Sequence, residues 1–174
     1  MALIRVLILI VLLVVFIQDL KSRSVYWFLF PEIVGLFFAI SLLQRRSFSE
    51  ILQPAGMNCV FLFIQLLLVS AYFSIKNRRW VNITNELLGW GDILLLLSSA
   101  FYLSVLNFLF FYIISLIMSL AVWLIWQILS GKKDTKIPLA GLQAVGLVLF
   151  LMSDWYILHF NAAGDTWLLN FIHQ

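Results

Sequence analysis

Long runs of apolar residues dominate this chain, and they limit what it can fold into. The longest run extends from Asp92 to Leu129 and carries no charge after its first residue. A single helix over that stretch would be about 57 Å long, whereas the hydrocarbon core of a bilayer is only ~30 Å thick. The run must therefore fold back on itself, and we place the turn at its weakest point, Ser104–Asn107.

Four further apolar runs each approach the length of one membrane crossing. They cover Ala2–Ile17, Val25–Leu43, Ala55–Ile75 and Ile137–Trp155. The chain is 64% hydrophobic and 11% charged, which excludes a water-soluble monomer and a disordered chain. A single Cys excludes a disulfide scaffold. We therefore predict an all-α, polytopic membrane protein, with one domain over residues 1–174 that forms a bundle of six transmembrane helices.

Basic residues divide unequally between the two sides of this predicted bundle. The loops after the first, third and fifth spans carry Lys21, Arg23, Lys76, Arg78, Arg79, Lys132, Lys133 and Lys136. The opposite side carries Arg5, Arg45 and Arg46. Because cytoplasmic loops are rich in Lys and Arg, we expect the first group to face the cytoplasm and both termini to lie outside. The net charge of +3 thus reflects membrane topology rather than a nucleic-acid partner.

Two of the eight acidic residues have apolar sequence beside them and lie at the same predicted membrane face. Asp19 ends the first span, and Asp92 begins the fourth. Asp92 follows Gly89-Trp90-Gly91, where the glycines permit a tight turn and a close backbone approach. Taken singly, Asp92 is more simply a helix N-cap and Asp19 a polar stop at the interface.

Together, these two carboxylates would form a chemical pair. Carboxyl groups a few ångström apart cannot both ionise cheaply, so they share a proton. The ionised group can take a proton from water while the protonated group polarises a carbonyl, without a metal or cofactor. The two His residues and the single Cys do not have the spacing of a metal site. The helix dipole favours Asp92, at a helix start, as the base and Asp19, at a helix end, as the acid.

Three segments occur in an order that is typical of one family of membrane proteases. They are Asp19–Val25 with Pro31 beyond it, Gly89–Asp92 with the pattern G-x-G-D, and Ile137–Gly146, which opens with Ile-Pro. In this order, across six spans, they resemble the type IV prepilin peptidases and the related preflagellin peptidases, which are membrane aspartyl proteases. The resemblance extends over nearly the whole chain.

This resemblance implies roles for particular residues. Asp19 and Asp92 would be catalytic, and Gly89 and Gly91 would shape the second motif. The implied substrate is a pilin-like precursor with a short basic leader and an apolar helix, which is cut between them. Cleavage would take place at the cytoplasmic face of the bacterial inner membrane.

The chain also departs from the family pattern. Val25-Tyr26-Trp27 stands where the family has Ile-Pro-Asn, and Leu94 stands where a Lys commonly follows the G-x-G-D motif. These departures concern substrate choice more than the chemistry. Cys59 has no C-x-x-C partner, so we expect peptidase activity without the methyl transfer of the longer family members.

Three residues are further candidates for contact with the substrate or the acidic pair. Arg23 is an anchor at the lipid phosphates or a counter-charge to a carboxylate, and Pro138 belongs to the third motif. Glu32 lies about 10 Å into the second predicted span, where pairing inside the bundle is the simpler expectation than contact with a leader peptide. Pro31 beside it would kink that span.

Two other functions remain open at this stage. A proton-coupled transporter could use Asp19, Glu32 and Asp92 as a relay through the membrane. A catalytically silent scaffold of a pilus or secretion assembly would account for the departures from the family pattern. Small residues in the last span (Ala140, Gly141, Ala144 and Gly146) predict close helix contacts under any of these functions.

Overall fold

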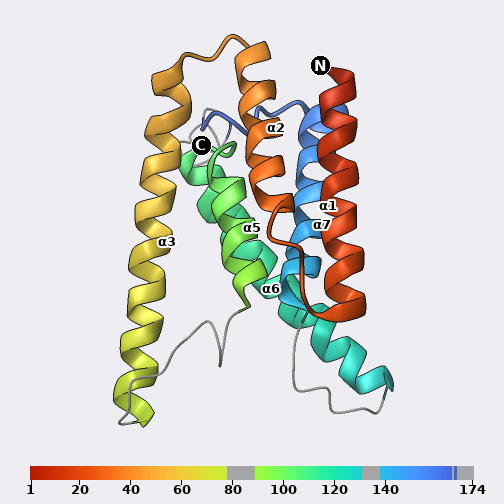
Figure 1. The fold of residues 1–174 in the computed structure, drawn as a ribbon, viewed down its shortest axis with the longest axis vertical. Helices are drawn as coiled ribbons and strands as arrows, with labels where there is room; N and C mark the ends of the chain where they lie inside the picture. The colour runs from red at the N-terminus through yellow and green to blue at the C-terminus, as the bar shows by residue number, and fades with distance from the viewer. Residues whose placement is uncertain (78–88, 131–137, 166, 168–174) are drawn as a thin grey trace.

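The computed structural model describes residues 1–77, 89–130, 138–165 and 167, and within these ranges the chain is helical. The helices are α1 Ala2–Ser22, α2 Leu29–Leu43, α3 Phe48–Asn77, α5 Trp90–Ala100, α6 Val105–Ser130 and α7 Leu139–Met152, and α7 continues into a π-helical turn, η1 Ser153–Leu158. They run alternately in opposite directions through one bundle, with α1 and α7 packed side by side (Figure 1).

The predicted class, an all-helical membrane protein, is confirmed. In the described ranges, α1, α3, α6 and α7 with η1 are long and apolar enough to cross a membrane. α2 and α5 are apolar but shorter, about 22 Å and 16 Å at the standard helical rise. Helix length thus supports four crossings, rather than the six that apolar runs alone suggested.

The break between α5 and α6 lies close to the predicted turn. α5 ends at Ala100 and α6 begins at Val105, a few residues before the centre of the predicted stretch. Ser104 precedes the first helical residue, and its carbonyl accepts the first helical hydrogen bond, from the Phe108 amide at 2.8 Å. The buried Asn58 side chain of α3 donates hydrogen bonds to the carbonyls of Ala100 and Leu103 and so fixes the connection between α5 and α6.

The second span differs most from its prediction. α2 begins at Leu29 rather than Val25, and Figure 1 shows that it starts part-way along the bundle. Pro31 therefore lies in its first turn, where a missing N–H is tolerated, and does not kink the helix. Glu32 also lies in this first turn with its side chain exposed. The expected pairing of Glu32 inside the bundle is therefore wrong.

The core is a set of apolar stripes that face inward from adjacent helices. The fully buried members include Ile8 and Leu12 of α1, Ile33 and Phe37 of α2, Leu95 of α5, and Leu147 and Leu151 of α7. Within each helix these residues recur at helical spacing. Many large apolar side chains point outward instead, as expected for helices that are surrounded by lipid.

The small residues of α7 bring it close to its neighbours, as predicted. A Cβ added at Gly141 would lie 3.3 Å from the carbonyl oxygen of Phe16 on α1. A Cβ added at Gly146 would meet Phe111 and Ser115 of α6. α7 is thus clamped between α1 and α6, and its first turn is held against the end of α1.

Candidate active site

Asp19 lies in the last full turn of α1 and points into the bundle. Only 7% of it is exposed. Its Oδ2 accepts a hydrogen bond from the backbone N–H of Gly141 at 2.6 Å. The helix ends at Ser22, and its C-cap residue Arg23 adopts a left-handed conformation (φ 51°). The predicted polar stop is therefore a buried carboxylate bound to another helix.

Asp92 occupies the third position of α5, after the N-cap residue Gly89. Its Oδ2 accepts the Gly89 N–H at 3.0 Å, which is the backward half of a capping box. It also accepts the backbone N–H of Ala140. Asp92 is 8% exposed. The N-cap residue is therefore Gly89, whereas the sequence suggested Asp92; Asp92 completes the cap from the third position, and the same carboxylate also reaches α7.

The two carboxylates converge on consecutive amides in the first turn of α7. Asp92 binds the N–H of Ala140, and Asp19 binds that of Gly141. Consecutive Cα atoms are only about 3.8 Å apart, so the two acids are neighbours, and their negative charges repel one another. A helix N-terminus attracts anions because its N–H groups are unpaired and its dipole is positive.

This arrangement changes the expected division between acid and base. The sequence argument considered only the helix that carries each Asp, and there Asp19 meets the unfavourable end of α1. In the fold, Asp19 also meets the favourable end of α7, through the same turn that holds Asp92. The dipole argument therefore no longer separates the two residues, and the assignment of Asp92 as base stays a prediction.

Two glycines, Gly141 and Gly89, permit close approaches to the carboxylates. A Cβ at Gly141 would lie 3.1 Å from Asp19 Oδ2, and one at Gly89 would lie 3.3 Å from Asp92 Oδ2. At Gly91 a Cβ would meet Ala140 and Val25 at ordinary contact distances of 3.5 and 3.6 Å. The approach is therefore tight at Gly89 and ordinary at Gly91, and the loop-shaping role of both stays a prediction. Gly141 was missed as a site residue, although its position just after the Ile-Pro pair could have indicated it.

Arg23 and Pro138 lie beside the pair. Arg23 is exposed and close enough to Asp19 for an electrostatic attraction. Pro138 is the N-cap residue of α7. Both line a cavity of about 280 Å³ whose other walls are Leu20, Val122, Trp123, Trp126 and Leu142. Glu32 is not among the residues that the described structure brings to this place.

The opposite end of the bundle holds a second polar cluster, which consists of helix caps and loop ties. Asp165 accepts the Ser104 hydroxyl at 2.5 Å and the Leu106 N–H at 3.1 Å, and so caps α6. Asn107 donates to Ser104 Oγ and to the carbonyls of Ala162 and Gly164. We call this region the tail cluster.

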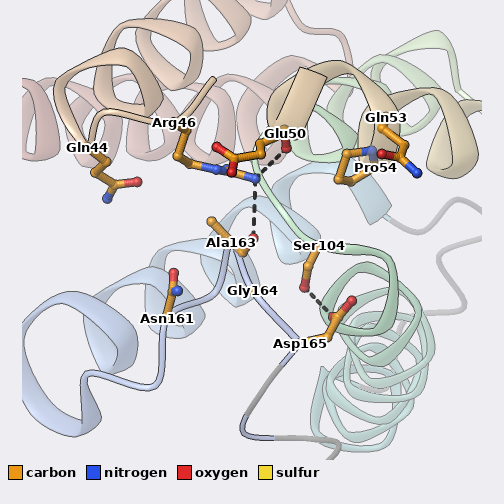
Figure 2. Close-up of a pocket in the computed structure, with 10 residues that line it drawn as sticks. All are labelled: Gln44, Arg46, Glu50, Gln53, Pro54, Ser104, Asn161, Ala163, Gly164 and Asp165. Atoms are coloured by element: carbon orange, nitrogen blue, oxygen red, sulfur yellow. Dashed lines mark hydrogen bonds between the residues drawn. The ribbon is translucent and has the colours of Figure 1, made fainter. Parts of the chain in front are cut away.

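A polar cavity of about 610 Å³ opens beside the tail cluster (Figure 2). Pro54 lies inside α3 and has no N–H for the carbonyl of Glu50. Arg46 supplies that bond from Nη2 at 2.8 Å, and it also binds the carbonyl of Ala163. The Arg46 side chain in the cavity wall therefore binds backbone carbonyls of two segments and ties them together.

The topology prediction rests partly on basic residues that lie outside the described residues. They are Arg78, Arg79, Lys132, Lys133 and Lys136.

Compared with known protein families, curated proteins and solved structures, the chain has no significant match.

Proposed function

We propose that this chain is a membrane-embedded aspartic endopeptidase of the prepilin-peptidase type. One observation carries the proposal: Asp19 and Asp92, from two different helices, bind consecutive amides of a third helix and repel one another. Such a pair lowers its electrostatic energy by sharing one proton. A shared proton between two buried carboxyl groups is the requirement of aspartic protease chemistry.

The reaction needs only these two groups and water. The ionised carboxylate removes a proton from water as its oxygen attacks the scissile carbonyl, and the protonated carboxyl group donates to the carbonyl oxygen. The tetrahedral intermediate then collapses and the C–N bond breaks. The departing amine takes the proton that the first carboxyl group received from water. A hydroxyl of the intermediate returns its proton to the second carboxylate as the C=O bond re-forms, which restores the pair with its one proton.

The arrangement also favours a particular membrane topology. We propose that α2 and α5 complete six crossings as short helices, so that the ends of α1 and α5 that hold the pair share one face. The basic residues next to that end make it the cytoplasmic face. The substrate would then be a pilin-like precursor whose basic leader stays in the cytosol.

An apolar groove supports access for the helical part of such a precursor. It has a volume of about 490 Å³ and runs between α6 and α7, with Gly146 and Ser115 in its walls. It shares Val122 and Leu142 with the smaller cavity next to Pro138. A precursor helix in the bilayer could therefore follow a continuous path toward the acidic pair.

The positions of the buried acids disfavour a transporter. A proton relay needs acids through the depth of the membrane. The buried acids of the described residues lie at the two ends instead: Asp19 and Asp92 at one, and Asp154 at the other. Glu32, the third member of the relay considered from the sequence, is exposed.

The test is cleavage of pilin-like precursors from the same genome, first by co-expression and then with purified protein. Asp19→Asn and Asp92→Asn should each lower the rate of cleavage by about 10²–10⁴-fold, because one proton-transfer group is lost. Neither should lower the melting temperature, since each removes a charge repulsion. Asp165→Asn is the matched control in the tail cluster and should cleave normally. Cleavage by both pair variants at the wild-type rate would disprove the proposal. So would a folded wild-type protein that cleaves none of these precursors, which is the result expected for a scaffold.

A further inference from the structure

One buried side chain near the acidic pair has polar atoms that the fold does not use. Gln143 of α7 is 0% exposed. Neither its Oε1 nor its Nε2 has a hydrogen-bond partner among the described residues. Buried polar side chains are almost always paired, so an amide with two unpaired atoms indicates a small polar molecule beside it.

The position of Gln143 is set by its neighbours along α7. It lies three residues after Ala140, and hence about 4.5 Å along the helix on the same face. Ala140 binds Asp92 and faces Gly91 of α5. Gly146, three residues further on, faces Phe111 and Ser115 of α6. Gln143 therefore faces the seam between α5 and α6, one turn deeper in the membrane than Asp92.

Helix geometry also directs this side chain toward the acidic pair. Cα–Cβ bonds in an α-helix tilt toward the N-terminus, so a side chain covers the turn before its own Cα. For Gln143, that preceding turn carries Ala140 and Gly141, the two amides that bind the carboxylates. The other buried residues of α7 are apolar or glycine. Gln143 is thus the one buried polar side chain that the described part of α7 directs toward the site.

We propose that Gln143 is a positioning residue that binds a water molecule next to Asp92 and holds it for attack. A carboxamide can donate to one partner and accept from another, which suits water. Hydrolysis inside an apolar bundle requires water to be held where bulk solvent does not reach. The role in hydrolysis rests on the proposed peptidase function, whereas the binding of water by Gln143 does not.

The experiment compares Gln143→Met with Leu147→Met in the purified full-length protein. Methionine matches the length of glutamine and removes only the amide. We expect Gln143→Met to lower kcat about 10²-fold, because a misplaced reactant costs that much, with KM unchanged and the melting temperature unchanged or lower. Leu147→Met, one turn deeper on the same buried face, should keep the wild-type kcat.

Two results would overturn the inference. If Gln143→Met melts at a higher temperature and keeps the wild-type kcat, the amide is simply unpaired. If a structure of the wild-type protein at water-resolving resolution shows no water within hydrogen-bond distance of the amide, the inference also fails. This second measurement needs no catalysis. It therefore tests water binding by Gln143 independently of the proposed function. Failure of the proposed function would instead appear as unaltered cleavage in the Asp19→Asn and Asp92→Asn variants.

Discussion

The two ends of the bundle bury carboxylates in different ways. In the tail cluster, Asp165 is satisfied by a hydroxyl and an amide that belong to one helix start. Near it, Asp154 accepts the Asn161 N–H at 2.7 Å and is attracted by Arg5. At the other end, Asp19 and Asp92 also accept amides, but each has the other carboxylate as its neighbour.

This difference separates structural acids from acids that are poised for chemistry. A carboxylate with fixed donors, and in the case of Asp154 with a nearby cation, holds loops together. Two carboxylates held against one another cost stability, and such arrangements are concentrated at functional sites. Substitutions at the tail cluster should therefore change stability, whereas substitutions around the pair should change activity.

The largest effect in this comparison is expected at Gly141. In Gly141→Ala the new Cβ would lie 3.1 Å from Asp19 Oδ2 and 3.3 Å from the Phe16 carbonyl oxygen, which is backbone and cannot rotate away. Either Asp19 or the first turn of α7 must move. We expect cleavage to fall by roughly tenfold, since a shift of about 1 Å costs about 10²-fold and these contacts demand only part of that shift. The measurement is kcat/KM with a purified precursor.

Gly146→Ala is the control for this substitution. It adds the same methyl group to the same helix, but the nearest atom, Phe111 Cε2, is 3.8 Å away, which is ordinary contact. Because Gly146 also lines the groove proposed for the precursor helix, the comparison is made on kcat, which should stay close to that of the wild type. An equal loss in both variants would mean that α7 tolerates no added volume anywhere, and that the approach to Asp19 is not special.

A smaller effect, on stability alone, is expected at Asn107 in the tail cluster. Asn107 is fully buried and donates three hydrogen bonds, and its Oδ1 accepts the Trp167 indole N–H at 2.9 Å. Asn107→Ala leaves these partners unpaired, which should lower the free energy of unfolding by about 1–3 kcal/mol. Thermal unfolding in detergent measures the loss.

Cleavage by folded Asn107→Ala should match that of the wild type, because no described contact joins Asn107 to the acidic pair. Asn107→Asp keeps the acceptor oxygen that binds Trp167 but turns the donor NH₂ into an oxygen that faces the carbonyls of Ala162 and Gly164, so it should lose at least as much stability. A folded Asn107→Ala protein with a strongly reduced kcat would show that the two ends are coupled. The tail cluster would then not be purely structural.

The sequence predicted the helical class and most helix positions, because apolar runs and charge placement directly reflect the bilayer. It missed the start of α2, since residues 25–28 are as apolar as the helix that follows them. Hydropathy does not distinguish an apolar link from an apolar helix. α3 begins at Phe48 rather than at Ala55, and the hydrogen bond from Arg46 to the Glu50 carbonyl that Pro54 leaves free is not visible in a sequence.

The acidic pair could be located from the sequence, but its environment could not. Motif order and loop charge placed Asp19 and Asp92 at one face, and the structure brings them together. The binding of both to α7 depends on how three helices pack, which no local pattern encodes. Gly141 therefore looked like a packing residue, and Gln143 attracted no attention because a single glutamine in an apolar helix has no motif.

The smallest effect is expected at Arg23, next to the pair but outside it. Its side chain is exposed, and water and salt screen its attraction to Asp19. Arg23→Gln should lower kcat/KM by about threefold or less, and the difference should shrink as salt is added. Lys21→Gln removes an equal charge from the same exposed helix end and serves as the control. A tenfold or greater loss that salt does not reduce would place Arg23 inside the site, as a direct partner of the carboxylates.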